Sequence, residues 1–323
     1  MKRPNALRMA VTLLAAMATT SVDAGAYPDH PVRIVLPFGA GGVADVSARI
    51  VADRLGERLG QRFLIENMPG AGGITAAKSV ISASPDGYTL GLVSNGTAIS
   101  AALFKRLPFD AATDFEMISM LGSFDLVFAV DAASPYKTLA DFITAAKAAP
   151  GKLDIGTVTV GSTQNLGAEL LKSAAGIDVQ IVPFRNSPDI VVGLLRNDVQ
   201  MMLDFPAAVK GQVDDGKLRL LATSGVKRSP SMPSLVTAAE SSVKDYEVTS
   251  WNGLFAPHGT PPAIIAQLNA TLKEVLAEPD IKQRLNDLGI ESRPSSPEEL
   301  MALFKADVKK WDAVILKAGI EKK

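Results

Sequence analysis

Short apolar runs that end in glycine, serine or proline alternate with helical periodicity along most of the chain, and this alternation restricts the possible folds strongly. The first unit is the clearest: residues 33–38 are predicted to form a strand, 39–42 a glycine turn and 44–59 an amphipathic helix. Further strands are predicted at residues 62–67, 88–94, 154–160, 179–184 and 199–204. Repeated strand–loop–helix units predict an α/β fold with doubly wound, mostly parallel sheets.

Two segments interrupt this alternation. Residues 126–135 and 246–257 are predicted to be long strands without a glycine–helix unit after them. The chain has 323 residues, which is more than one hydrophobic core usually serves, so two lobes are expected. We interpret the two segments as hinge strands that cross between the lobes. Lobe 1 would then contain residues 27–128 and 249–323, and lobe 2 residues 129–248.

The first 26 residues are typical of a secretory signal peptide. Three basic residues lie within the first eight, an apolar run covers residues 9–18, and Ala24-Gly25-Ala26 matches an A-x-A cleavage site. The apolar run is too short to span a bilayer, which argues against a membrane anchor. Cleavage is expected between Ala26 and Tyr27, and the processed chain is expected to be soluble in the periplasm.

The composition argues against several classes of function. The chain has 33 Lys and Arg against 34 Asp and Glu, and this near-neutral balance argues against a nucleic-acid-binding surface. It has no cysteine, which removes disulfides, thiolate metal sites and cysteine nucleophiles. Two histidines leave little room for a histidine-built metal site or general base. We therefore expect no metal and no cofactor.

The first glycine turn allows two interpretations. Residues 39–44 satisfy the dinucleotide-binding pattern G-x-G-x-x-A, and Glu66 follows at the distance expected of a ribose-binding acid. Against this, Pro37 interrupts the strand, Asp45 places negative charge where a pyrophosphate would lie, and the chain carries an export signal. The second interpretation is a carboxylate site, because glycines allow close approach and a helix N-terminus attracts anions.

Short motifs also occur in a characteristic order. They are YP at 27–28, PF-x-x-GG-x-x-D-x-x-x-R at 37–49, EN-x-PGAGG at 66–73, PDGYTL at 85–90, GKLR at 216–219, SW-x-GLFAP at 250–257 and GTP at 259–261. This ordered set resembles the Bug receptors, the periplasmic solute-binding proteins of tripartite tricarboxylate transporters. The resemblance implies a periplasmic binding protein fold that closes on one small carboxylate. It also implies membrane permease subunits as partners, no nucleic acid, and a monomer.

The resemblance further implies which residues bind the ligand. In the family, the loop after the first strand binds one carboxylate through backbone amides. That loop corresponds here to Phe38 to Gly42, with Asp45 just behind it, and both lobes would complete the cleft. The predicted ligand-binding set is Phe38, Gly39, Ala40, Gly41, Gly42, Asp45, Asn95, Thr97, Ser162, Thr163, Gln164, Arg185 and Asp204.

Several of these residues have a structural alternative. Arg185 either binds the distal carboxylate of the ligand or pairs with Asp189 at the surface. Asp45 either contacts the ligand or supplies charge at a helix terminus. Residues 162–164 either bind the ligand or cap the helix that follows. His258 is expected to be exposed to solvent.

Three functions remain open from the sequence. The first is a receptor that binds a small mono- or dicarboxylate and delivers it to a tripartite tricarboxylate-type transporter. The second is a periplasmic carboxylate sensor, or an orphan receptor, that acts in signalling. The third is a periplasmic enzyme such as a serine hydrolase, but the chain has no G-x-S-x-G nucleophile elbow and His258 is its only plausible base. We therefore expect that the protein is not an enzyme.

Overall fold

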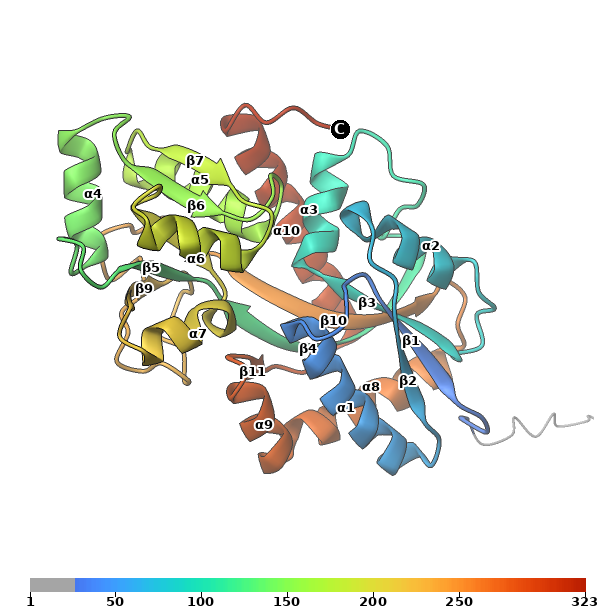
Figure 1. Ribbon diagram of the computed structural model, residues 1–323. Coiled ribbons are helices and arrows are strands. Elements are labelled where there is room, and N and C mark those ends of the chain that lie inside the picture. The colour runs from blue at the N-terminus through green and yellow to red at the C-terminus, as the bar shows by residue number, and fades with distance from the viewer. Residues whose placement is uncertain (1–26) are drawn as a thin grey trace, which may run out of the picture.

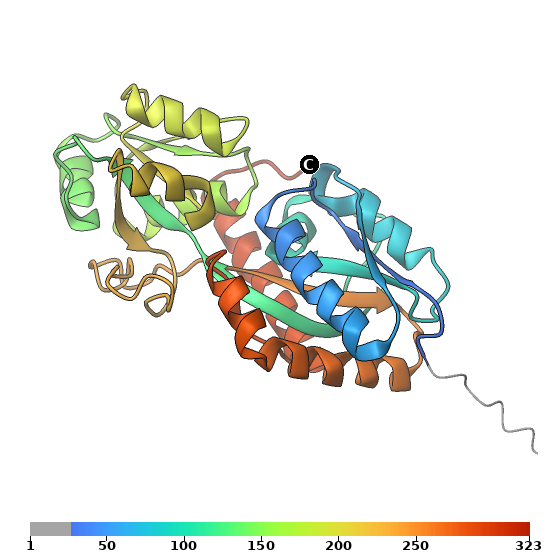
Figure 2. The same ribbon diagram turned by 60° about the horizontal axis from the view of Figure 1, so that its bottom comes forward.

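The computed structural model describes residues 27–323, so the predicted signal peptide lies outside the described residues. The chain forms two separate sheets, each with helices on both faces (Figure 1). In the turned view the segments coloured green to yellow form one lobe, and the blue, cyan and orange segments form the other (Figure 2). The predicted two-lobed α/β fold is confirmed. We call the lobe with the six-stranded sheet lobe 1 and the lobe with the five-stranded sheet lobe 2.

The sheet of lobe 1 has the strand order β11-β4-β10-β3-β1-β2. Its strands are β1 Val32–Leu36, β2 Phe63–Asn67, β3 Thr89–Ser94, β4 Phe115–Asp125, β10 Thr249–Pro257 and β11 Glu291–Ser292. Strand β1 pairs in parallel with β2 and β3, whereas β10 pairs antiparallel with β3 and β4, and β11 antiparallel with β4. Only the half of the sheet around β1 is therefore parallel.

The sheet of lobe 2 has the strand order β7-β6-β8-β5-β9. Its strands are β5 Val127–Asp131, β6 Asp154–Thr157, β7 Gln180–Pro183, β8 Met201–Asp204 and β9 Leu218–Thr223. Strand β6 pairs in parallel with β7 and β8, and β5 pairs antiparallel with β8 and β9. The prediction of mostly parallel sheets is thus wrong. Strands β4 and β5 carry the chain from lobe 1 into lobe 2, whereas β9 and β10 carry it back, so the pairs β4–β10 and β5–β9 run antiparallel.

Helices cover both faces of each sheet. In lobe 1, one face carries α1 Val43–Leu59, α8 Pro262–Ala277 and α9 Pro279–Asn286, and the other carries α2 Ile74–Ile81, α3 Asn95–Leu103 and α10 Pro297–Lys317. In lobe 2, one face carries α4 Leu139–Ala148 and α5 Thr163–Ala175, and the other carries α6 Ser187–Leu195 and α7 Pro206–Asp214. A short 3₁₀ turn, Ala71–Gly73, precedes α2.

One apolar cluster continues from lobe 1 into lobe 2. It joins Val93 and Met117 of the first sheet to Phe128 and Leu166 of the second lobe. Helix α10 contributes Trp311, which is completely buried, and packs against α3 and β4 as well as α5 (Figure 1). Burial of this shared surface stabilises the arrangement of the two lobes, because buried apolar area contributes about 25 cal/mol per Å².

The chain passes between the lobes twice. The first crossing is at Leu126, where β4 of lobe 1 ends and β5 of lobe 2 begins. The predicted long strand at 126–135 therefore stops at Asp131 and is followed by α4, a helix that was not predicted. The second crossing leads from β9 through residues 224–248 into β10. The proposed lobe boundaries stay a prediction, although strand pairing places Val127 and Phe128 in the sheet of lobe 2.

The carboxylate of Asp125, which lies beside the first crossing, approaches both ends of the second crossing. Asp125 is the last residue of β4, and its Oδ1 accepts a hydrogen bond of 2.9 Å from Thr249 Oγ1, at the start of β10. A Cβ atom added to Gly225 would lie 2.1 Å from Asp125 Oδ2, so a side chain at that position would require the carboxylate to move. Asp125 therefore lies where the two crossings meet.

Burial raises the pKa of Asp125 to about 6. The hydrogen bond from Thr249 lowers this pKa, the charges of Glu247 and Glu291 raise it, and the charge of Arg293 lowers it. Burial is the largest of these effects, since a carboxylate loses favourable hydration when it leaves water. The ionised form of Asp125 is consequently less stable in the folded protein than in the unfolded chain.

Asp125 should make the stability of the protein depend on pH. In the unfolded chain its pKa returns to about 4, so between about pH 4 and pH 6 the folded state binds more protons. The free energy of unfolding therefore falls as pH rises through this window, by up to about 2–3 kcal/mol. Asp125→Asn keeps an acceptor for Thr249 and carries no charge. In urea unfolding, the free energy of unfolding of Asp125→Asn should rise relative to that of the wild type as pH increases through this window. A difference between the two proteins that does not change with pH would contradict this.

Candidate ligand-binding site

A cavity of about 400 Å³ lies between the two lobes. Its wall includes three residues of the predicted ligand-binding set, namely Phe38 and Thr97 of lobe 1 and Ser162 of lobe 2. The remaining lining residues are Pro37, glycines of the loop before α2, residues between Ser94 and Phe104 on and beside α3, residues 159–161, and Lys323. The volume lies within the range of small-molecule sites in proteins. The structure thus brings part of the predicted site together at the lobe junction.

The loop between β1 and α1 reaches the cavity through Pro37 and Phe38, whereas residues 39–42, which belong to the predicted set, do not line it. Gly42 is the N-cap residue of α1 and provides no side-chain cap. Gly41 has φ +84°, a left-handed conformation that favours glycine. Its N–H donates a hydrogen bond of 2.9 Å to Asp45 Oδ2. The Gly41 amide is therefore engaged within the loop, and carboxylate binding by the other amides from Phe38 to Gly42 stays a prediction.

Asp45 holds this loop in place. Its carboxylate is 3% exposed and accepts hydrogen bonds from Arg49 Nε at 3.1 Å, Arg49 Nη2 at 2.9 Å and Asn67 Nδ2 at 2.9 Å. Asn67 also donates to the carbonyl of Phe38 at 3.0 Å. Hydrogen bonds from Arg49, with those from the Gly41 amide and Asn67, lower the pKa of Asp45 to about 2. Both oxygens are occupied, so the structure supports the helix-terminus alternative for Asp45.

Asn95 and Thr163 connect the lobes. Asn95 Oδ1 accepts a hydrogen bond of 2.9 Å from Thr163 Oγ1, and Asn95 Nδ2 donates to Asp307 Oδ2 at 2.8 Å. The same Asp307 oxygen accepts from Trp251 Nε1 at 2.7 Å. Asn95 is completely buried, Thr163 is 8% exposed, and neither lines the cavity. The structure therefore places both residues in a contact between the lobes and not in the cavity wall, where ligand binding was predicted for them.

Gln164 and Asp204 are buried in lobe 2 and hydrogen-bonded to each other. Asp204 Oδ1 accepts hydrogen bonds from Gln164 Nε2 at 3.0 Å and from the Phe205 amide at 2.8 Å. Asp204 is 1% exposed, and burial raises its pKa. The ring of Phe205 packs edge-on against Phe124 of lobe 1, with ring centroids 5.1 Å apart. The bonds of Asp204 to Gln164 and to the Phe205 amide therefore hold the segment just before α7, near the lobe junction. Neither Gln164 nor Asp204 lines the cavity.

Ser162 and Thr97 combine capping with a place in the cavity wall. Ser162 Oγ accepts the amide of Asn165 at 3.1 Å and so caps α5. Thr97 Oγ1 accepts the amide of Ser94 at 3.2 Å at the start of α3. Both residues line the cavity. The capping alternative is correct for Ser162, and capping does not remove this residue from the site.

The charged residues near the cleft are arranged differently from the prediction. Arg185 does not line the cavity; its side chain is 87% exposed, with Nε 3.9 Å from Asp189 Oδ2. Its predicted ligand contact stays a prediction. Lys323, which was not predicted, lines the cavity and is the one charged side chain among the described lining residues. His258, the only plausible base of a hydrolase, is 71% exposed and lies 2.8 Å from Glu116, away from the cavity.

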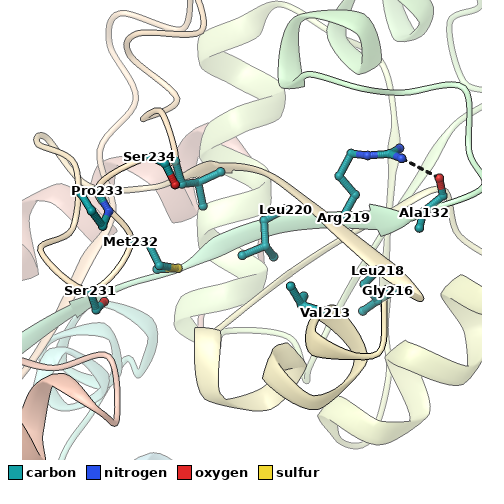
Figure 3. A pocket seen from close by; sticks show the side chains of 11 residues that line it. Ala132, Val213, Gly216, Leu218, Arg219, Leu220, Ser231, Met232, Pro233 and Ser234 are labelled. Carbon is teal, nitrogen blue, oxygen red and sulfur yellow. Dashed lines mark hydrogen bonds between the residues drawn. The ribbon is translucent and has the colours of Figure 1, made fainter.

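Another cavity, of about 600 Å³, lies entirely within lobe 2 (Figure 3). Apolar side chains such as Leu218, Leu220 and Met232 contribute to its wall. Arg219 donates to the carbonyl of Ala132 at 2.8 Å, so its guanidinium is held by the backbone. This cavity contains no residue of the predicted set, and movement of the lobes would not enclose it. The interlobe cavity is therefore the stronger candidate.

Comparison with known proteins decides the family. Residues 47–320 match the tripartite tricarboxylate transporter family receptor, TctC. The chain belongs to this receptor family. The receptor is 31% identical over 313 residues to a UPF0065 protein from the tcbD–tcbE intergenic region of Pseudomonas sp. strain P51, covering 96% of this chain and 93% of that one. It is 29% identical over 304 residues to BugT of Bordetella pertussis, covering 94% and 93% of the chains.

Solved structures resemble the receptor along most of its length. A protein of R. palustris with adipate has a TM-score of 0.80 and 32% identity, covering 91% of the receptor and 99% of that chain. The periplasmic binding protein BugD has a TM-score of 0.77 and 31% identity, with coverage of 92% and 100%. MatC of Rhodopseudomonas palustris with bound malate has a TM-score of 0.75 and 32% identity, with coverage of 90% and 100%. The predicted resemblance to Bug receptors is thus confirmed.

The described part of the receptor lacks two features. Within residues 27–323, each helix is too short or too polar to cross a membrane. The same residues contain no group of three or more histidine, aspartate or glutamate side chains that could hold a metal ion. The candidate site consists instead of backbone amides, hydroxyl groups, apolar side chains and Lys323.

Proposed function

We propose that this receptor binds a small mono- or dicarboxylate in the interlobe cavity and delivers it to the membrane permease subunits of a tripartite tricarboxylate-type transporter. The observation that carries the proposal is the convergence of three helix N-termini on one cavity. The N-cap residues of α2, α3 and α5, namely Gly73, Ser94 and Ser162, all line this cavity.

The electrostatics of this arrangement favour an anion. The first amides of each helix lack partners within the helix, and the aligned peptide dipoles place partial positive charge at that end. A carboxylate at such a site accepts hydrogen bonds from backbone amides without requiring a buried cation. Structural neighbours of the same family, solved with adipate and with malate, support a carboxylate as the ligand class.

The lobes would close on the ligand by rotation about the two crossings. Residues from both lobes line the cavity, so a ligand that contacts both binds the closed form more tightly and shifts the population toward it. Arg185, at the start of α6, would approach the ligand only on closing. We further propose that the protein acts as a periplasmic monomer after removal of residues 1–26, and that binding requires no cofactor.

A thermal-stability screen tests the proposed ligand class. Purified residues 27–323 would be heated with a panel of carboxylates and with matched alcohols that lack the acid group. A carboxylate present at about 100 times its dissociation constant should add about 2.7 kcal/mol to the free energy of unfolding. The matched alcohol should have little effect. If no carboxylate in a broad panel raises the unfolding temperature, the proposed function is wrong.

A further inference from the structure

A groove between α7 and α9 also has walls from both lobes. Its volume is about 810 Å³. Lobe 2 contributes α7 and Leu220 of β9, and lobe 1 contributes the C-terminal end of α9 and Gly289. It contains no residue of the predicted ligand-binding set. Because each lobe supplies one wall, the width of this α7–α9 groove depends on how the lobes are oriented.

The α7–α9 groove and the interlobe cavity lie on opposite sides of the crossing strands. In the sheet of lobe 1, β4 and β10 lie between β11, beside the groove, and β3 and β1, which lead to the cavity. In the sheet of lobe 2, β5 lies between β9, which borders the groove, and β6, which leads to the cavity. Figure 1 shows α7 and α9 below the crossing strands and α3 above them.

The two walls of the groove meet at Pro206 and Gly289. Pro206 is the first residue of α7, and Gly289 lies between α9 and β11. A Cβ atom on Gly289 would lie 3.7 Å from both Cβ and Cγ of Pro206, which is an ordinary packing distance. The neighbouring ring of Phe205 packs against Phe124 of lobe 1. These contacts stabilise the arrangement in which Arg185 lies outside the cavity wall.

We propose that closing of the lobes on a ligand opens the α7–α9 groove, so that the contact between Pro206 and Gly289 opposes closure and lowers the ligand affinity. This inference rests on the proposed function and adds a means of regulating it. When two lobes turn about their crossings, walls on opposite sides of the crossings move in opposite directions. A ligand shifts the population of the closed form only by its difference in affinity for the two forms, and breaking the groove contact reduces that difference.

A disulfide across the groove tests this inference, in a variant that combines Pro206→Cys with Gly289→Cys. The Cβ separation of 3.7 Å lies within the range of about 3.5–4.5 Å found in disulfides. The chain has no cysteine of its own, so the two introduced thiols can pair only with each other within one molecule. Gly289 has φ +75°, and the strain of a side chain there affects the oxidised and the reduced form alike. Comparing the two forms therefore isolates the effect of the lock.

Calorimetry with adipate and malate as probes measures the effect, and the strongest acid of the thermal screen replaces them if neither binds. Oxidation of the double variant should weaken binding roughly tenfold or more, and reduction should restore it. Small-angle scattering gives a second readout that loss of stability would not move. Saturating acid should lower the radius of gyration of the reduced form and leave that of the oxidised form unchanged. Gly289→Cys alone is the matched control and should bind equally well under both conditions.

Other outcomes would overturn the inference. If the oxidised form binds as tightly as the reduced form, or more tightly, closing does not open the groove. If reduction does not restore the affinity, the substitutions weaken binding and the lock does not. If the two cysteines fail to form a disulfide, the walls do not meet at Pro206 and Gly289. In each of these cases the wild type still binds a carboxylate, whereas failure of every acid with the wild type would overturn the proposed function, and this inference with it.

Discussion

Replacing Gly41 with valine is expected to abolish carboxylate binding, with a loss of affinity of more than about a hundredfold, or 2.7 kcal/mol. A β-branched residue is strongly disfavoured at φ +84°, although a Cβ atom there would meet no other atom within 4 Å. The loop is therefore expected to relax to another conformation and to lose the bond between the Gly41 amide and Asp45. Isothermal titration with a ligand identified in the thermal screen measures the loss.

A control for backbone strain exists in the same helix. Gly60, the C-cap residue of α1, has φ +75° and equally open space around its Cβ position. Gly60→Val should lower the free energy of unfolding by about 1–2 kcal/mol, as Gly41→Val should, and keep full ligand affinity. If both variants lose binding equally, the effect is a general consequence of destabilisation. If Gly41→Val keeps its affinity, the loop does not bind the carboxylate.

Truncation of Asp307 should cause a large loss of stability, about 2–5 kcal/mol. Asp307→Ala removes the acceptor shared by the Trp251 indole and the Asn95 amide, and both donors are buried. A buried donor without a partner costs its full desolvation free energy. This one substitution leaves two such donors, the Trp251 indole and the Asn95 amide. Because Asn95 also accepts from Thr163, the interlobe contact should weaken too. Urea unfolding near neutral pH measures the loss.

Asp307→Asn separates the hydrogen bonds from the charge. Both donors reach the same oxygen of Asp307, and asparagine retains one acceptor oxygen at that position. Burial raises the pKa of Asp307, so removal of the charge itself is not expected to destabilise the protein. We expect Asp307→Asn to remain within about 1 kcal/mol of the wild type. Equal losses in the alanine and asparagine variants would show that the shared acceptor is not what stabilises this site.

Local patterns were sufficient to predict much of the fold. The strand before Phe38, the helix after Gly42 and the βα units of lobe 2 all follow from hydrophobic periodicity and glycine turns, which act over a few residues. Three residues of the predicted set, Phe38, Thr97 and Ser162, line the interlobe cavity, and their contact with a ligand stays a prediction. Strand direction was not predictable in this way, because antiparallel pairing of β10 with β3 and β4 joins segments that are far apart in the sequence.

The missed parts of the site depend on contacts between distant segments. The side chain of Asn95 meets Asp307, and Lys323 meets Leu103, only after the final helix has folded onto lobe 1. The resemblance to Bug receptors implied a ligand contact for Asn95 and Thr163, but matching motifs do not distinguish a residue that faces a cavity from one that bonds across a lobe junction. Lys323 shows no local motif.

The position of β10 has a consequence for the order in which the protein can form. Strand β10 lies between β3 and β4 in the sheet, although about 120 residues that include all of lobe 2 separate β4 from it in the chain. While the chain is synthesised from its N-terminus, β3 and β4 therefore expose unpaired edges until β10 is made. Such edges are sites of aggregation. Lobe 2 can complete its sheet first. The lobe that begins the chain is the one that must wait for the end of the chain to fold.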